Sequence, residues 1–347
     1  CVKYAIDNNI SIKQTELDTK TANIDKKGAI GNFIPSLNSN ASHSWNIGLN
    51  QDPTTGLLRN QTTQYSSMGV GVGFDIYKGM QNQNALRKAN LSIISAKYQL
   101  TKMQEDVALN VANAFLQVLF NKENLKVQQN QKAINEKQLA RSEELVKAGS
   151  VPRGDLLDIK AIVASDNQKI IVAENALLIS KLSLAQLLQL KEFYDFDVTD
   201  ETSAKDENNI LAQTPVAIYE KAKEERTELK IAKTNLEIAE KNVSIAKGAF
   251  QPSLQGFYNI NTRISYADTF SIINGMPASQ PAASFSDQFS NNKGQAFGAQ
   301  LNIPVFNGFS VKNNVERSKV NLEKSKIAVE QEELALDRIV YTGFTDA

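Results

Sequence analysis

The sequence predicts a mainly α-helical protein with a smaller β component, in which long antiparallel helical hairpins are joined to four β-strands. Three observations support this fold class: the chain contains one unit twice, a very long segment lacks proline and glycine, and four segments alternate between apolar and polar residues. The repeated unit is a helix, a strand, a loop, a strand and a long helix. Each copy is therefore expected to adopt the same local structure.

The internal repeat is visible at two places. Residues 28–37 (GAIGNFIPSL) resemble residues 245–254 (IAKGAFQPSL), a shift of 217 positions, and residues 74–79 (FDIYKG) resemble residues 303–308 (IPVFNG), a shift of 229 positions. The first repeat, 1–214, is predicted to contain a helix at 1–31, strands at 34–50 and 65–78, a helical hairpin at 80–190 with its tip at 148–155, and a connector at 191–214. The second repeat, 215–347, is predicted to contain a helix at 215–248, strands at 251–265 and 294–306, and a helix at 311–347.

A helix of about 68 residues is predicted from Met80 to about Ala148, because no proline or glycine interrupts it. At about 1.5 Å per residue it would be roughly 100 Å long. Gly149 suits a left-handed residue after the helix, Pro152 cannot continue it, and Asp155 is placed to cap or charge the start of the returning helix. The apolar residues of the long helix recur with coiled-coil spacing and include Leu100, Met103, Val107, Val111, Ala114, Val118 and Leu125.

Each predicted strand places apolar residues on one face and small or polar residues on the other. A half-buried sheet in a soluble protein would give the same alternation. The length of the strands and the uncharged polar residues of the second face favour a membrane β-barrel, whose apolar face contacts lipid and whose polar face lines a wet lumen. The predicted lipid-facing residues are Val70, Val72, Phe74, Leu254, Ile260, Phe297, Leu301 and Ile303.

Aromatic residues flank the strands at one common end. Phe33 and Phe250 precede the first strand of each pair, while Tyr77 and Phe306 end the second. Together they are expected to form an interfacial membrane girdle. Because four strands cannot close a barrel, which needs about eight, several chains must contribute to one barrel. The loops, roughly 51–65 and 265–293, would project at the far end.

Composition excludes several classes of function. Lys plus Arg is 38 and Asp plus Glu is 38, so the net charge is zero and nucleic acid is not an expected partner. One cysteine and one histidine, His43, give no basis for a metal site, a cofactor or a Ser/His/Asp set, and we predict that the protein is not an enzyme. The sequence contains no run of 18 apolar residues, so no transmembrane helix is predicted. Trp45 and Tyr65 are expected to pack or to lie at an interface.

The two ends of the chain suggest a piece of a longer protein. The chain has no starting Met, and Cys1 is either a lipid-anchored residue or part of the amphipathic helix that begins there. The helix at 311–347 has no returning partner, unlike its counterpart in the first repeat, so we expect a second hairpin beyond it.

With these features in place, the whole chain resembles the TolC family of outer membrane efflux factors. The resemblance rests on the duplication, on the entries Phe33 to Leu37 and Phe250 to Leu254, on the exit Pro304 to Gly308, and on the tip Ala148 to Pro152 followed by residues 155–158 (DLLD). It implies a homotrimer in the cell outer membrane, in which each chain gives four strands to one 12-stranded barrel and the helices form a duct in the periplasm.

The resemblance also implies partners and a function. The protein would be a passive export duct for small molecules or proteins, in a tripartite efflux or type I secretion system, joined by a periplasmic adaptor (membrane fusion) protein to an inner-membrane pump. The tip that matches the adaptor-contacting part of the family is Gly149, Ser150, Val151, Pro152 and Asp155. A soluble periplasmic coiled-coil adaptor or scaffold is the alternative, although the second strand pair speaks against it.

Overall fold

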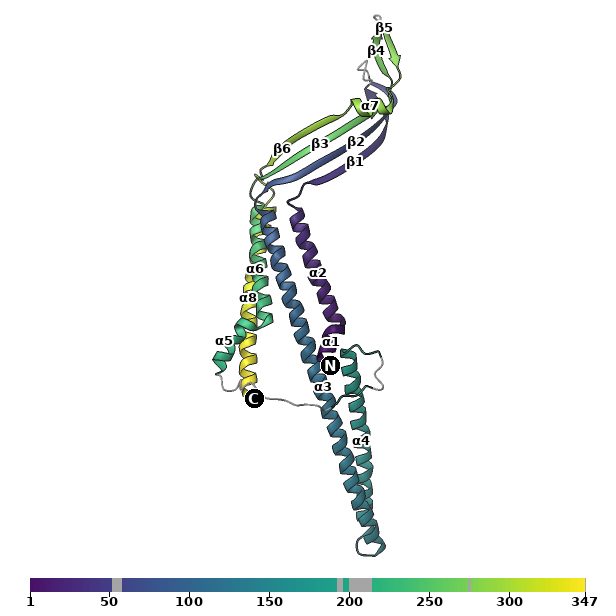
Figure 1. Cartoon of the computed structure of the whole chain (residues 1–347), viewed down its shortest axis with the longest axis vertical. Coiled ribbons are helices and arrows are strands. Elements are labelled where there is room, and N and C mark those ends of the chain that lie inside the picture. Colours follow the sequence, from purple (N-terminus) through teal and green to yellow (C-terminus); the bar gives the residue numbers. More distant parts are fainter. Residues whose placement is uncertain (52–57, 192–195, 200–213, 274–275, 347) are drawn as a thin grey trace. The chain divides into compact units, whose positions relative to one another are not determined.

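The structure is a computed structural model of the chain that describes residues 1–51, 58–191, 196–199, 214–273 and 276–346 (Figure 1). The chain divides into two compact units: unit 1 comprises Cys1–Thr21, Ile93–Lys233 and Glu330–Ala347, and unit 2 comprises Ala22–Ser92 and Thr234–Val329. The helices are α1 (Val2–Asn8), α2 (Ile10–Gly31), α3 (Gln81–Lys147), α4 (Arg153–Leu187), α5 (Pro215–Glu225), α6 (Thr227–Gly248), α7 (Phe285–Asn291) and α8 (Ser310–Asp346). The strands are β1 (Ser36–Gln51), β2 (Leu58–Lys78), β3 (Ser253–Ser265), β4 (Thr269–Ile273), β5 (Met276–Gln280) and β6 (Gly294–Asn302).

The core of unit 1 lies along the hairpin of α3 and α4. Val107, Val111 and Val118 of α3 are fully or almost fully buried, and they pack in one cluster with Leu184 of α4. The predicted coiled-coil seam of α3 therefore forms this core. The predicted connector 191–214 lies largely outside the described residues, but its Val198 is buried in the same cluster.

Both repeats interrupt their first helix at the same place. The helix predicted at 1–31 breaks at Asn9, whose backbone is extended and whose side-chain oxygen accepts hydrogen bonds from the backbone N–H groups of Ser11 and Ile12, at 2.8 and 3.4 Å. The helix predicted at 215–248 breaks at Arg226, which is also extended and lies 217 positions after Asn9. Asparagine is a strong N-terminal cap, which explains the first break.

The repeat is equally visible in the backbone after β2 and β6. Gly79 and Met80 both have positive φ angles, 57° and 58°, and so do Gly308 and Phe309, at 61° and 62°. The two pairs are 229 positions apart, which is the second shift found in the sequence. The same reversal thus leads from each strand pair into a long helix, α3 or α8.

Unit 2 contains a four-stranded antiparallel sheet in the order β1-β2-β3-β6, so β1 and β6 are its edge strands. The predicted fold class, long helices with four antiparallel strands in two repeats, is confirmed. The strands β2 and β3 bring the two repeats together along the middle of the sheet, from Tyr65 paired with Ser265 to Lys78 paired with Ser253. We call the end of the sheet that joins α2, α3, α6 and α8 the helix end, and the opposite end the loop end.

The loop end is more ordered than predicted. β2 begins at Leu58 rather than at residue 65, and the predicted loop 265–293 contains the β4–β5 hairpin and the helix α7. The sequence signal for α7 is the N-terminal cap Ser284, three residues before Asp287. The Ser284 hydroxyl accepts a hydrogen bond from the backbone N–H of Asp287. β6 ends at Asn302, so Ile303 lies just beyond the strand.

Helix α4 is the one described helix that is long and apolar enough, by length and composition alone, to cross a membrane. It packs along α3 instead, as the shared cluster of unit 1 shows. It also contains Asp166, whose side chain is 2% exposed. A carboxylate inside a spanning segment would be costly, so this helix fits the hairpin better than a membrane.

Candidate functional site

The sheet has two exposed faces of opposite character. Register places Val70 opposite Ile260, Val72 opposite Tyr258, and Tyr258 opposite Phe297, so these residues share one face. Phe297 is 82% exposed, which is far from what a core-facing residue would show. Seven of the eight predicted lipid-facing residues lie in strands on this apolar face, namely Val70, Val72, Phe74, Leu254, Ile260, Phe297 and Leu301; Ile303 follows the end of β6 and is also exposed.

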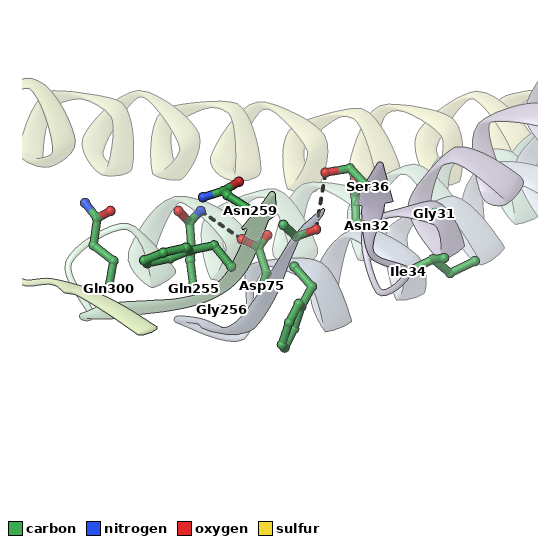
Figure 2. A pocket seen from close by; sticks show the side chains of 12 residues that line it. Gly31, Asn32, Ile34, Ser36, Asp75, Gln255, Gly256, Asn259 and Gln300 are labelled. Atoms are coloured by element: carbon green, nitrogen blue, oxygen red, sulfur yellow. Dashed lines mark hydrogen bonds between the residues drawn. The ribbon is translucent and has the colours of Figure 1, made fainter. Parts of the chain in front are cut away.

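The opposite, polar face is hollowed and lined by amides, hydroxyls and glycines. A hollow of about 780 Å³ extends along it from Ser36 to Arg263, and a second of about 600 Å³ lies nearer the helix end. Gly71 leaves room for a neighbouring amide, because a Cβ there would stand 2.5 Å from the side-chain oxygen of Asn259 and would displace it. In Figure 2 the side chains of Gln255, Asn259 and Gln300 rise from the strands on the same side. This face is suited to water and polar solutes.

Asp75 anchors the polar face at the helix end. Its carboxylate accepts hydrogen bonds from Lys78 at 3.0 Å, Gln255 at 2.9 Å and Asn82 at 3.3 Å. Figure 2 shows the bond from Gln255. Lys78 balances the negative charge, and the amides of Gln255 and Asn82 join β3 and the start of α3 to β2. Sequence reasoning missed this cluster, because Gln255 lies 180 positions away in the other repeat.

The four predicted girdle residues all lie at the helix end of the sheet. Phe33 and Phe250 lie three residues before β1 and β3, Tyr77 is near the end of β2, and Phe306 follows β6. All four are exposed, and the hydroxyl of Tyr77 donates a hydrogen bond to Gln251. Their placement is that of an interfacial girdle, and their contact with lipid stays a prediction.

At the loop end the two faces carry different aromatic clusters. On the polar face, the guanidinium of Arg263 lies 4.2 Å from the ring centre of Tyr65, a cation–π contact. On the apolar face, Ser66 joins His43 at 2.8 Å and Tyr266 at 3.1 Å, and His43 also meets Trp45 edge-on. His43 is therefore part of a hydrogen-bonded aromatic cluster, and within the described residues no group of acidic, His or Cys side chains could hold a metal ion.

The hairpin tip is a compact turn between α3 and α4. Gly149 has φ of 72°, its N–H bonds the carbonyl of Val146 at 3.0 Å, and the N–H of Ser150 bonds the carbonyl of Leu145 at 2.9 Å. This pair of bonds is a Schellman motif and explains the glycine. Pro152 occupies the position before α4, and Asp155 lies in the first turn rather than at the cap. All predicted tip residues except the half-buried Val151 are exposed.

Comparison with known proteins gives one family and several similar structures. A family model described as "Outer membrane efflux protein" matches residues 2–189 and 218–346. No curated protein sequence matches the chain. Among solved structures, the outer-membrane channel OprN has a TM-score of 0.79 at 16% identity, with 99% of this chain and 72% of that chain covered.

Two further structures show the same likeness. VceC, an outer membrane protein from Vibrio cholerae, has a TM-score of 0.74 at 15% identity and covers 96% of this chain and 74% of that chain. The CmeC outer membrane channel of Campylobacter jejuni has a TM-score of 0.75 at 14% identity, with 96% of this chain and 67% of that chain covered. At these identities the structural likeness supports the fold.

Proposed function

Because the chain belongs to the outer membrane efflux protein family, we propose that it is the outer membrane channel of a tripartite efflux or type I secretion system, in which it acts as a passive export duct. Family membership places the chain in the outer membrane and makes it a transport protein rather than an enzyme. Three copies would close a 12-stranded barrel, with the apolar face toward lipid and the polar face around the lumen. Small molecules or proteins would pass through it, driven by an inner-membrane pump.

The observation that carries this proposal is a four-stranded sheet with an exposed apolar face, a hollowed polar face and two edge strands. A soluble half-buried sheet covers its apolar face with other elements, whereas Val70, Phe74 and Phe297 are all more than 40% exposed. Four strands enclose no lumen by themselves, so edges β1 and β6 need strands from further copies.

The helices also present unpartnered surfaces that further copies would cover. On three helices, large apolar residues recur seven positions apart and stay about half exposed or more, which is the spacing of a helix-packing seam. We propose that these seams pack against helices of further copies of the chain, because a symmetric homo-oligomer uses the same surfaces in every subunit. The residues are Ile10, Leu17 and Ile24 of α2; Phe120, Val127 and Ile134 of α3; and Val320, Ile327, Leu334 and Tyr341 of α8.

Conductance in planar lipid bilayers tests the duct directly. Full-length protein is expected to form channels, and Asn259→Trp on the polar face is expected to lower their conductance, because a large ring would narrow the lumen. Val70→Leu, on the apolar face of the same sheet, is the matched control and should leave conductance unchanged. Absence of channels from intact protein, or equal conductance in both variants, would contradict the proposal.

The tip of α3 and α4 is proposed to contact a periplasmic adaptor protein through Gly149, Ser150, Val151, Pro152 and Asp155. The proposal is supported by the exposed Schellman turn, which presents a small, rigid surface. A photo-crosslinking residue at Ser150 in cells should capture one adaptor, whereas the same residue at Lys126, exposed in the middle of α3, should not. Equal capture at both positions would exclude a tip-specific contact.

The soluble periplasmic adaptor, the alternative function, is not supported. The matching family is one of outer membrane proteins, and it covers both repeats. The second strand pair also completes the same sheet as the first rather than a separate compact β domain.

A further inference from the structure

We infer that α7, together with the aromatic cluster beside it, forms the outer interfacial girdle of the barrel and lies in the headgroup region of the outer leaflet. The inference rests on the proposed function, because it needs the apolar face of the sheet to contact lipid. Its ligand is the lipid surface itself, at the boundary between acyl chains and headgroups.

The first step is the position of α7, which replaces a strand at the edge of β3. β6 pairs with β3 only as far as Asn261, so the backbone groups of residues 262–265 on that side have no strand partner. Gln288 of α7 fills this role by accepting the N–H of Ser265 and donating to its carbonyl, both at 2.9 Å. Asn292 donates to the carbonyl of Arg263 at 2.7 Å, so the exposed edge is closed.

The second step is the face on which α7 lies. The hydroxyl of Thr262, on the apolar face, donates to the carbonyl of Phe289 at 3.2 Å. Thr262 is 6% exposed and Ile264 is fully buried, whereas Tyr258 and Ile260, which precede them on the same face of β3, are 37% and 38% exposed. The contact with Thr262 and the burial of Ile264 place the helix over the apolar face. Figure 1 shows α7 at the loop end of β3 and β6.

The third step is the chemistry that α7 presents outward. Phe285 and Phe289 stack with ring centres 6.1 Å apart and remain 48% and 38% exposed. The ammonium of Lys293 lies 5.7 Å from the ring centre of Phe289. Aromatic rings beside a cation are favoured where acyl chains meet phosphate headgroups, because the rings face the chains and the cation faces the phosphates.

The same level of the sheet carries aromatic residues on the other strands. Trp45 on β1 and Tyr266 after β3 are both exposed. The hydroxyl of Ser66 forms hydrogen bonds with His43 and with Tyr266, and so links β1 to the end of β3. Beyond Trp45 the same face of β1 carries Ile47 and Leu49, which are paired with the polar residues Thr62 and Asn60 of β2. The outer girdle thus runs across the sheet as Trp45, His43, Tyr266, Phe285, Phe289 and Lys293.

The separation of the two girdles fits a membrane. Leu254 pairs with Tyr77 at the helix end, and Ile264 lies beneath α7 at the loop end. The strand between them rises roughly 33 Å at ~3.3 Å per residue, which becomes ~25 Å along the axis of a barrel whose strands tilt by about 40°. The apolar band of outer membrane barrels is about 25 Å tall.

Fluorescence quenching by brominated lipids tests the inference, and Trp45, the one tryptophan of these 347 residues, serves as the reporter. The fluorescence of the full-length Trp45→Phe protein is subtracted. Full-length protein is inserted into phosphatidylcholine vesicles with bromine near the headgroup end or near the methyl end of the acyl chains. Trp45 is expected to lose more intensity with the shallow bromine. Stronger quenching by the deep bromine, or none from either lipid in inserted protein, would overturn the inference.

A second reporter tests α7 itself. Phe289→Trp in a Trp45→Phe background should show the same preference for shallow bromine, with the fluorescence of the Trp45→Phe protein subtracted. Tyr65→Trp in that background is the matched control. Position 65 lies on the polar face beside Arg263, opposite Ser265 at the loop end of β3, so its tryptophan should not be quenched.

The outcomes separate this inference from the proposed function. An unquenched Phe289→Trp in a protein that inserts and conducts would mean that a neighbouring copy covers α7, which overturns the inference and leaves the duct intact. A full-length protein that neither inserts nor conducts would contradict both.

Discussion

At the scale of single residues, adjacent positions on β3 face different surroundings. Ile260 lies on the apolar face opposite Val70, and Asn261 lies on the polar face opposite Gly69. Ile260→Lys is expected to destabilise the membrane-inserted protein by about 2–4 kcal/mol, whereas Asn261→Lys, in contact with water, should cost far less. Urea unfolding from lipid vesicles measures both. Equal losses in the two variants would mean that the faces are not lipid and lumen.

A pair of glycines gives a second comparison, between the two repeats. Gly79 and Gly308 both adopt positive φ, so alanine costs about 1–2 kcal/mol at either position. A Cβ at Gly79 would also stand 2.1 Å from the carbonyl oxygen of Gly248, whereas Gly308 faces open space. Because two backbones approach there, Gly79→Ala should cost about 1–3 kcal/mol more than Gly308→Ala. The midpoints of thermal unfolding measure the difference, and equal midpoints would contradict the close approach.

Residue faces could be predicted from the sequence, because alternation needs only local information. The Asp75 cluster could not, since its partner Gln255 belongs to the other repeat and only the register of β2 and β3 brings the two together. The same holds for Gly71, whose missing side chain makes room for Asn259 on the neighbouring strand.

At the scale of elements, the hairpin of α3 and α4 contains one buried carboxylate. Asp166 accepts a hydrogen bond from Asn135 on the facing helix and another from Lys169 at 3.2 Å. The Asn135 amide, helped by Lys169, holds the pKa of Asp166 below its usual range although burial opposes this. The ionised form therefore links the two helices.

This link should make the hairpin sensitive to acid. A carboxyl group whose pKa is lowered by folding adds stability above its unfolded pKa, about 3.9, and loses that contribution as the pH falls through the folded value. Asp166→Ala should therefore lower the thermal midpoint strongly at neutral pH and progressively less below about pH 4. Asp158→Ala, at an exposed position of the same helix, is the control. A loss at Asp166 that is independent of pH would contradict the link.

Element boundaries were predictable where the breaking residue has a local signal and not elsewhere. The long helix ends at Lys147, just before Gly149, and Pro152 lies at the start of the returning helix. The break at Arg226 has no such signal, because arginine suits a helix, and it became visible only as the counterpart of Asn9. Helix α7 has seven residues, too few to be stable alone, and depends on the bonds that Gln288 and Asn292 make with β3.

At the scale of the whole molecule, one chain leaves most of its functional surfaces uncovered. The sheet has two edge strands, and the apolar seam residues of α2, α3 and α8 are about half exposed or more. In the proposed trimer, the edge strands and the helix seams of each chain contact those of its two neighbours. The lumen then acquires its polar lining, and the apolar faces form one lipid-facing band.

The oligomeric mass of the full-length protein tests this account most directly. The protein is extracted from membranes in detergent, and its mass is measured by light scattering with the detergent contribution subtracted. The account predicts a trimer, since three chains with four strands each close one barrel. A water-soluble monomer would contradict it and would return the strands to an ordinary half-buried sheet.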